Sequence, residues 1–353
     1  MREDKLRKKL QEQSLDGLII TALSNIEWLT GFTGSHGIVL LLRSGLTYFL
    51  TDFRYQEQSQ EEVTTCKVII TNQSLFDEIN TVGIQLTGKI GFQSENLSFE
   101  MFEQLSQKLS ECTLLPVKDF CCEYVSVKCD AEIDLIQKAT DITAKVFDKI
   151  LGIIRPEITE KELAAEISYW NKRFGADKDS FSPIVSSGAR SALPHARPTD
   201  CKIGNQTVLL IDMGCRYNGY CSDQTRTLFL GTPDNEFRSV YEIILQAHLM
   251  GISGAKAGIY GKDLDSISRN HISSKGYGEH FGHGLGHGVG LQIHEHPRIN
   301  TKSQDMLTKN MVITIEPGIY LPGKFGVRIE DAIVVTESGG VSLAKTNKRL
   351  ITL

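Results

Sequence analysis

The sequence predicts an α/β domain followed by an α+β domain. In the first third of the chain, apolar runs of strand length alternate with helical patterns, which is typical of an α/β layer. The remainder places long helical patterns beside apolar strands and glycine-rich loops. At 353 residues the chain is longer than one ordinary core. We expect the domains to cover residues 1–127 and 128–353.

The first domain is predicted from six apolar segments and their boundaries. A helix is expected from Leu6 to Gly17, where the glycine ends it. Helical segments are expected between the strands, for instance near residues 99–109. The expected strands are residues 18–21, 37–42, 47–52, 67–70 and 89–92.

The second domain begins with apolar residues at three- and four-residue steps between 133 and 150, which predict a long helix that Arg155-Pro156 stops. Thr159 and Glu162 form a capping box for the next helix. Two more helices are expected around residues 237–245 and 264–267.

Composition and charge exclude several classes of protein. The net charge of −5 gives no basic excess to neutralise phosphates, so we expect no nucleic acid partner. No apolar run approaches the roughly 18 residues that span a bilayer. The charged N-terminus does not resemble a secretory signal. The eight cysteines include no CxxC pair, which indicates reduced thiols and a cytoplasmic protein.

Two aspartates lie on the strands of a predicted hairpin. An Asn-Gly pair at 218–219 favours a two-residue turn, which pairs residue i with residue 437 − i, so that Asp212 faces Thr225. Asp223 then shares that face, at a diagonal of about 7–8 Å. Asp212 ends the apolar run 208–211, where a solvated surface acid would be out of place. Carboxylates on one face repel each other unless a cation lies between them.

Glycine occupies every second position from 282 to 290, around His283 and His287. This pattern excludes a stable helix, so the two histidines are not a helical i, i+4 metal pair. In an extended strand they would lie about 13 Å apart on one face. We therefore expect one metal ligand and one histidine that faces substrate. A lone histidine is usually structural, but five between 280 and 296 indicate a site.

Glu316 and Glu330 each interrupt or end a β-branched strand. Alone, either could be an edge-strand charge. Together with Asp212, Asp223 and one histidine they make a set that suits a pair of divalent ions about 3.5–4 Å apart, whether Mn²⁺, Co²⁺, Fe²⁺ or Zn²⁺. The negative charge of four carboxylates nearly balances the positive charge of two such ions, and buried charges need to be balanced in this way.

At these residues the sequence resembles the pita-bread metallopeptidases, within them the Xaa-Pro aminopeptidase and prolidase branch. The resemblance covers essentially the whole chain. Its first part is similar to a creatinase-type N-terminal domain, with Trp-Leu-Thr-Gly-Phe at residues 28–32 and Thr-Asp-Phe-Arg-Tyr at 51–55. The second-domain motifs lie at residues 184–188, 193–195, 212–214, 222–227, 283–295, 315–320 and 328–331.

The resemblance implies a pita-bread catalytic domain and two divalent ions, with Mn²⁺ preferred. The implied metal ligands are Asp212, Asp223, His287, Glu316 and Glu330. Asp223 and Glu330 would bridge the ions, with Asp212 completing one site and His287 with Glu316 the other.

The resemblance also implies residues that act on the substrate. Glu316 would shuttle the proton of the attacking water. His195, His283 and His294 would hold the substrate and stabilise the tetrahedral intermediate. Arg328 would lie beside the bridging glutamate.

The activity implied first is an Xaa-Pro aminopeptidase, which releases the residue before proline from peptides with proline in second place. The alternative is a prolidase restricted to Xaa-Pro dipeptides, for which Arg298 could bind the C-terminal carboxylate. A non-catalytic pita-bread binding module is a third interpretation, but such modules lack metal ligands, and all five are present here.

Relatives of this build are commonly homodimers, so the resemblance implies a homodimer. The loop at residues 31–37 holds three glycines and His36. This loop could reach the active site of a partner subunit and limit substrate length. It could also be only a tight turn, which the sequence alone slightly favours.

Overall fold

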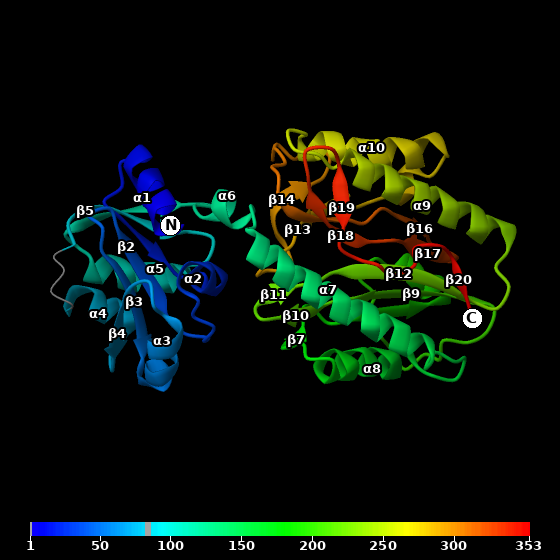
Figure 1. Ribbon diagram of the computed structural model, residues 1–353, viewed down its shortest axis with the longest axis horizontal. Coiled ribbons are helices and arrows are strands. Elements are labelled where there is room, and N and C mark those ends of the chain that lie inside the picture. Colours follow the sequence, from blue (N-terminus) through cyan, green and yellow to red (C-terminus); the bar gives the residue numbers. More distant parts are fainter. Residues whose placement is uncertain (1, 82–85) are drawn as a thin grey trace. The chain divides into compact units, whose positions relative to one another are not determined.

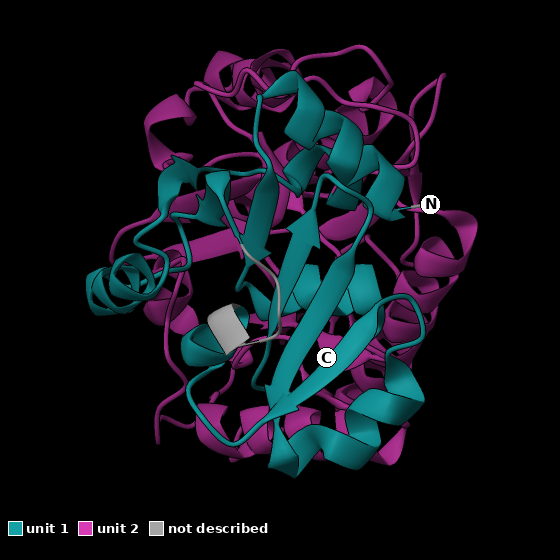
Figure 2. Cartoon of the chain, turned by 90° about the vertical axis from the view of Figure 1, so that its left-hand side faces the viewer, with its two compact units in different colours: residues 1–125 teal, residues 126–353 magenta. Residues whose placement is uncertain are grey.

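The computed structural model describes residues 2–81 and 86–353. The chain forms two compact units, residues 1–125 and 126–353, which Figure 2 shows in separate colours. Among the described residues, no helix combines the length and apolar character needed to cross a bilayer.

The first unit is built on one six-stranded mixed sheet in the order β4-β3-β2-β1-β5-β6 (Figure 1). The pairs β1–β2 and β2–β3 are antiparallel, and the other neighbours are parallel. The strands are β1 (Gly17–Ile20), β2 (Ile38–Leu42), β3 (Thr47–Asp52), β4 (Lys67–Thr71), β5 (Gly88–Gln93) and β6 (Cys112–Val117). The helices are α1 (Arg2–Glu12), α2 (Leu23–Thr30), η1 (Phe53–Tyr55), α3 (Gln56–Glu62), α4 (Leu75–Thr81), α5 (Phe99–Lys108) and α6 (Cys122–Val125). Helices and a mixed sheet confirm the predicted α/β class.

The first helix is shorter than predicted. It ends at Glu12 and not at Gly17, which begins β1. Ser14 has φ of 55°, a left-handed conformation that cannot continue a right-handed helix. Leu6 and Leu10 are still fully buried on the inner face of this helix.

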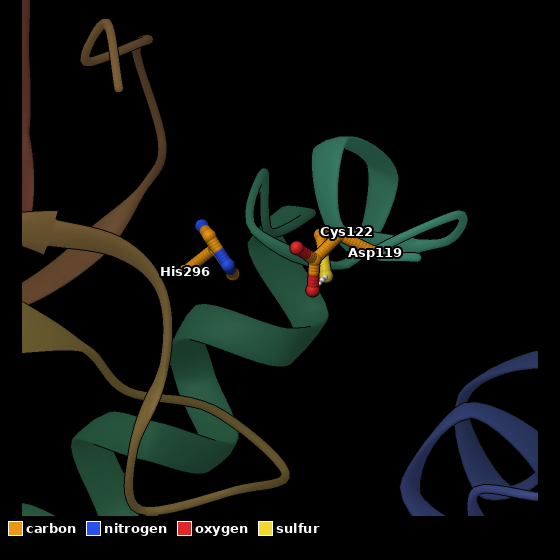
Figure 3. A group of neighbouring side chains, drawn as sticks. All are labelled: Asp119, Cys122 and His296. Atoms are coloured by element: carbon orange, nitrogen blue, oxygen red, sulfur yellow. Dashed lines mark hydrogen bonds between the residues drawn. The ribbon is translucent and has the colours of Figure 1, made fainter. Parts of the chain in front are cut away.

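The vicinal cysteines of the first unit lie where α6 begins. The Cys122 thiol donates to Asp119 Oδ1, with Sγ and Oδ1 3.5 Å apart (Figure 3). Burial raises the pKa of both Cys121 and Cys122 to about 12, and Asp119 adds to the effect on Cys122. These thiols are therefore protonated and unreactive near neutral pH, and all eight cysteines are free.

The second unit packs helices on both sides of its strands. Helices α7 (Asp130–Leu151) and α8 (Glu160–Arg173) share a core with a four-stranded sheet, order β20-β12-β9-β8. Helices α9 (Asn235–Gly254) and α10 (Gly261–Ser274) share another with a five-stranded sheet, order β14-β13-β15-β18-β19. Figure 1 shows the strands of this unit between the two helix pairs.

Short elements complete the second unit. Strands β11-β10-β7 form a three-stranded sheet, and β16-β17 form a hairpin. The strands are β7 (Lys178–Asp179), β8 (Ile184–Ser187), β9 (Thr207–Met213), β10 (Cys215–Tyr217), β11 (Tyr220–Cys221), β12 (Gln224–Leu230), β13 (Gly286–Gly288), β14 (Glu295–Ile299), β15 (Val312–Ile315), β16 (Gly318–Leu321), β17 (Phe325–Arg328), β18 (Asp331–Val335), β19 (Gly340–Ser342) and β20 (Ile351–Thr352). The 3-10 helices are η2 (Gly188–Ala192) and η3 (Gly278–His280).

The helix and hairpin predictions for this unit are largely confirmed. The capping box at Thr159 and Glu162 is formed at the start of α8. The long helix α7 ends at Leu151, with Gly152 as its C-cap, before the predicted stop at residues 155–156. The hairpin register is the predicted one, since Asp212 pairs with Thr225.

The glycine-rich strand is much shorter than the alternating pattern suggests. Only Gly286–Gly288 is extended as β13, and the register shifts between His287 and Gly288. His283 lies in a bend before the strand. The glycines fit here because backbone approaches closely: a Cβ at Gly286 would lie 2.0 Å from the carbonyl oxygen of Thr314.

Candidate active site

A cavity of about 540 Å³ in the second unit collects the predicted site residues. Strand ends and loops supply its lining, including Phe181 and Ile293 as apolar walls. The predicted residues that line it are His195, Asp212, Asp223, His283, His287, His294, Arg298, Glu316, Arg328 and Glu330. Residues spread over 136 positions of sequence therefore meet in one place.

The predicted metal ligands come from both main sheets. Asp212 lies on β9, and Asp223 directly precedes β12 of the same sheet. In the five-stranded sheet, His287 lies on β13, Glu316 follows β15 and Glu330 precedes β18. Asp223, His287 and Glu330 offer ligand atoms within 4.8 Å of one another. His287 Nε2 lies 3.7 Å from Asp223 Oδ2 and 3.5 Å from Glu316 Oε1.

Arg328 holds two of these carboxylates in place. Its Nη2 donates to Asp212 Oδ2 at 2.6 Å, and its Nε donates to the hydroxyl of Thr225 at 3.1 Å. The Thr225 hydroxyl in turn donates to Glu330 Oε2 at 2.6 Å. Asp212 is the residue paired with Thr225 across the hairpin, so the register brings this arrangement together.

Burial and mutual repulsion shift the carboxylates toward protonation when no cation is bound. Burial raises the pKa of Asp223 well above its ordinary value, and the charges of Glu330, Asp212 and Glu316 raise it further. The pKa of Glu316 is raised by burial and by Glu330. Burial and Asp212 raise the pKa of Glu330 to about 8.

The pKa values of three histidines of the cavity are shifted in the opposite direction. Burial lowers the pKa of His287 to about 3, and the neighbouring His294 adds to this effect. The two rings meet edge to face, with centroids 4.3 Å apart. Burial also lowers the pKa of His294, and that of His283 falls to about 4. All three are neutral near pH 7, which suits a metal ligand and hydrogen-bonding groups.

His283 is joined to Arg328 through a residue that sequence reasoning missed. The Tyr320 hydroxyl lies 2.9 Å from His283 Nε2 and accepts a hydrogen bond from Arg328 Nη1 at 2.8 Å. His283 Nδ1 lies 2.8 Å from the carbonyl oxygen of Gly284. Both ring nitrogens of His283 are thus engaged. The signal in the sequence was the position of Tyr320 at the end of the matched segment 315–320.

The remaining two histidines face the cavity with free ring nitrogens. His195 follows η2 and His294 precedes β14, and both are exposed. Neither ring forms a hydrogen bond to another residue of the described chain. Thr225 was placed by the predicted register but given no role, and it proves to connect Arg328 with Glu330.

The residues present fit divalent cations. Asp212 Oδ1 is buried and has no hydrogen-bond partner among the described residues, although an ionised oxygen in that position needs one. Four carboxylates and one neutral imidazole are hard or borderline ligands, as divalent first-row metals prefer. Cations bound there would also remove the repulsion that raises the carboxylate pKa values.

Comparisons with known proteins find family models that match both parts of the chain. The model of metallopeptidase family M24 matches residues 134–337, and that of the creatinase/prolidase N-terminal domain matches residues 2–122. An Xaa-Pro dipeptidase of Pyrococcus furiosus is 37% identical over 99% of both chains.

Solved structures extend the likeness to the fold. An Xaa-Pro dipeptidase from Bacillus anthracis has a TM-score of 0.95 and 36% identity, covering 100% of this chain and 99% of its own. An X-Pro aminopeptidase from Thermotoga maritima has a TM-score of 0.92 and 34% identity over 99% of both chains. The predicted pita-bread fold is confirmed, and the chain belongs to metallopeptidase family M24, with a creatinase/prolidase N-terminal domain.

Proposed function

We propose that the protein is an Xaa-Pro dipeptidase that uses two divalent ions. The observation that carries the proposal is the meeting of four carboxylates and His287 in a cavity that Arg298 also lines. The sequence favoured an aminopeptidase over this alternative. Relatives named Xaa-Pro dipeptidase, similar over nearly their whole length, support the dipeptidase instead.

The proposed ions would be held by Asp212, Asp223, His287, Glu316 and Glu330. Bound ions would supply Lewis acidity for the scissile carbonyl and would acidify the attacking water. Arg328 keeps Asp212 oriented through a buried ion pair at 2.6 Å. Thr225 keeps the Glu330 carboxylate oriented by its hydrogen bond.

Glu316 is proposed to move the proton. It follows the end of β15 and keeps about 18% of its side chain exposed, so it remains open to the cavity. It would accept a proton from the attacking water and give it to the proline nitrogen as the peptide bond breaks. His195 and His294, with free ring nitrogens, would contact the substrate. His283 would steady the Tyr320 hydroxyl beside it.

Arg298 is the residue proposed to select dipeptides. It lines the cavity, and its guanidinium has no hydrogen bond or ion pair to another described residue. A dipeptide ends in a carboxylate one residue beyond the scissile bond, and a guanidinium can bind that group through two hydrogen bonds. A tripeptide has an amide at the same position.

The aminopeptidase remains the second candidate, because a structure of that name is similar over 99% of the chain. The two activities differ in their need for the free carboxylate. We would measure kcat/KM of the Mn²⁺-loaded protein for an Xaa-Pro dipeptide and for the matching Xaa-Pro-Yaa tripeptide, in wild type and in Arg298→Met.

A dipeptidase should cleave the dipeptide far faster, and Arg298→Met should raise KM for the dipeptide at least about tenfold, as expected for loss of a charged hydrogen bond. Faster tripeptide cleavage in wild type would favour the aminopeptidase. Hydrolysis of neither peptide would reject both.

The metal, assembly and compartment are also proposals. Mn²⁺ is proposed because oxygen ligands dominate the set. A homodimer is proposed from the resemblance to two-domain relatives. A cytoplasmic location is supported by eight cysteines that are all free.

A further inference from the structure

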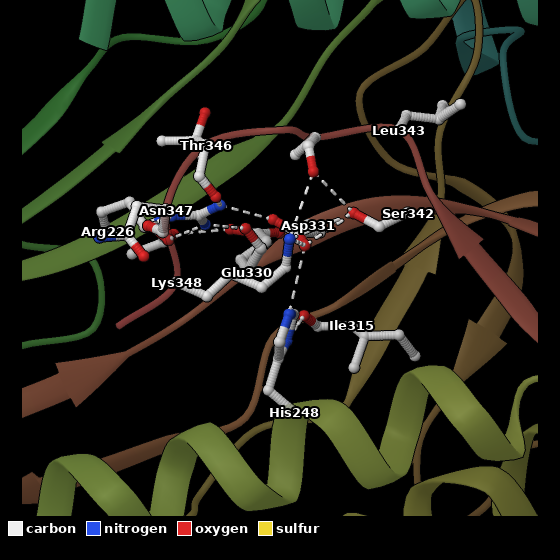
Figure 4. A network of polar contacts seen from close by, with 12 residues as sticks. Arg226, His248, Ile315, Glu330, Asp331, Ser342, Leu343, Thr346, Asn347 and Lys348 are labelled. Carbon is white, nitrogen blue, oxygen red and sulfur yellow. Dashed lines mark hydrogen bonds and ion pairs between the residues drawn. The ribbon is translucent and has the colours of Figure 1, made fainter. Parts of the chain in front are cut away.

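A buried polar network lies beside Glu330, a residue of the proposed metal set, and reaches Ile315, the residue before Glu316 (Figure 4). Its centre is the Asp331 carboxylate, which is fully buried and follows Glu330 in the chain. Asp331 Oδ1 accepts a hydrogen bond from Arg226 at 2.8 Å. Three other side chains contact it, and none of the side chains around Asp331 lines the cavity. The proposed hydrolysis therefore leaves this network without a role.

The second oxygen of Asp331 gathers three donors from separate elements. Its Oδ2 lies 2.7 Å from Lys348 Nζ, 2.8 Å from Ser342 Oγ and 3.3 Å from His248 Nε2. Burying such a carboxylate costs much free energy unless it is fully paired. Here both oxygens of Asp331 have donors, so the carboxylate is held in position from several elements.

Arg226 carries the network to Glu330. Its Nη1 donates to the carbonyl oxygens of Glu330 at 2.7 Å and Thr225 at 2.8 Å. The Glu330 amide donates back to the Thr225 carbonyl at 3.1 Å. The guanidinium therefore fastens Glu330 to strand β12, which begins just after Asp223.

His248 carries the network to Glu316. From α9, its Nδ1 donates to the carbonyl oxygen of Ile315 at 2.9 Å, one residue before Glu316. Ile315 also pairs with Asp331 in the register of β15 and β18. One carboxylate is thus linked through side chains to the backbone beside both Glu316 and Glu330.

We infer that Asp331 is a positioning residue that, through Arg226 and His248, fixes the spacing of Glu316 and Glu330. The inference rests on the metal site of the proposed function. Carboxylates crowded in one buried place repel each other when ionised, and a backbone held in position keeps these ligands together for binding. Outer groups that orient metal ligands commonly change affinity by about 10–100-fold when removed.

The test is Mn²⁺ binding to the full chain after chelation, measured by calorimetry for wild type and Asp331→Asn. We expect the Kd for Mn²⁺ to rise about tenfold or more. In the Mn²⁺-saturated protein, kcat for the dipeptide should fall more than KM changes, because the cavity walls stay intact.

Glu160→Gln is the matched control. Glu160 is also a fully buried carboxylate with several donors, but its partners Ser187, Arg190 and Thr199 donate, among the described residues, to no proposed metal ligand and to no backbone beside one. It should lower the Tm of the metal-free protein and leave the Kd for Mn²⁺ unchanged. Wild-type affinity in Asp331→Asn would overturn the inference. So would an equal loss of affinity in Glu160→Gln at a similar Tm.

If Asp331→Asn does not fold, His248→Phe tests the same inference, because it removes two hydrogen bonds and leaves the ion pairs of Asp331 with Arg226 and Lys348 in place. It should also weaken Mn²⁺ binding, and unchanged affinity would contradict the inference. Mn²⁺ binding needs no peptide. A wild type that binds Mn²⁺ but cleaves no Xaa-Pro bond would therefore reject the proposed function separately.

Discussion

At the scale of single residues, the site concentrates charges that a fold without cations tolerates poorly. Asp223 and Glu330 are almost fully buried, and the charge of Glu330 raises the pKa of both Asp223 and Glu316. The histidines respond to the same burial by becoming neutral. Burial therefore keeps the imidazole neutral and able to bind a cation, and it makes the ionised carboxylates unfavourable when no cation is bound.

This charge arrangement predicts how metal-free stability depends on pH. A carboxyl whose folded pKa is raised binds more protons when folded, so stability falls as pH rises toward about 8, the pKa of Glu330. The lowered pKa values of His283, His287 and His294 act in the opposite direction, but this effect fades as pH rises above their ordinary value of 6.5. Toward pH 8 the carboxylate effect is therefore the larger of the two.

The Tm of chelated protein should therefore fall as pH rises from 6.5 to 8, and saturating Mn²⁺ should abolish the fall because cations replace the protons. Thermal scans at several pH values would measure it. A metal-free Tm that rises from pH 6.5 to 8 would show that the carboxylates are not coupled as described.

The two histidines of the glycine segment should differ in their effect on metal. His287 lies within 4.8 Å of two carboxylates, whereas His283 binds Tyr320 outside that group. His287→Ala should lose metal and activity, and His283→Ala should keep metal but lose most of kcat/KM. Elemental analysis with kinetics would measure both. Equal metal loss in the two variants would place His283 among the ligands.

Much of this residue set could be proposed from sequence because Asp212, Glu316 and Glu330 each interrupt or end an apolar strand, the Asn-Gly turn places Asp223 beside Asp212, and the family resemblance joins them into one set. Tyr320, Arg226 and His248 could not be found in that way. Each is an ordinary residue for its element, and its contacts depend on how two sheets and α9 pack. Local pattern carries no information about such contacts.

At the scale of elements, the close approach of β13 and β15 sets the position of His287. A Cβ at Gly286 would lie 2.0 Å from the Thr314 carbonyl oxygen, whereas one at Gly282 would meet nothing within 4 Å. Gly286→Ala should therefore cost about 1–3 kcal/mol, as overpacking does, and lower metal content. Gly282→Ala is the control and should change neither.

Denaturant unfolding and elemental analysis of the two glycine variants would check this. Normal stability and metal content in Gly286→Ala would mean that the strands can separate without moving His287. The glycine pattern correctly excluded a helix here, but the extended strand considered from it was too long. Alternation alone does not reveal the bend at His283 or the register shift after His287. By contrast, the Asn-Gly turn determines its own register, which was correct.

At the scale of the whole molecule, the chain divides into two units because each has hydrophobic core clusters of its own. The proposed metal ligands and the polar network around Asp331 belong to the second unit alone. In the first unit, His36 Nδ1 lies 2.7 Å from Asp52 Oδ2, and Arg54 also binds Asp52. This contact holds the loop 31–37 to the end of β3, with the His36 side chain 47% exposed.

The proposed role of the loop at residues 31–37 can be tested together with the proposed homodimer. If the loop limits substrate length in a partner subunit, the protein is a dimer by light scattering, and His36→Ala changes KM or the ratio of dipeptide to tripeptide cleavage. Its stability should stay within about 0.5 kcal/mol of wild type, as for other surface substitutions. A fully active monomer, or an unchanged ratio, would leave the loop as a turn that closes the sheet.

The central claim is that Asp223 and its neighbours hold two divalent ions that hydrolysis requires. The most direct measurement is the number of Mn²⁺ ions bound per chain, with dipeptide turnover, in wild type and Asp223→Ala. We predict two ions and turnover in wild type. In the variant we predict fewer ions and no turnover, because the substitution removes the Asp223 carboxylate, a proposed bridging ligand. Two ions and full turnover in Asp223→Ala would contradict the account.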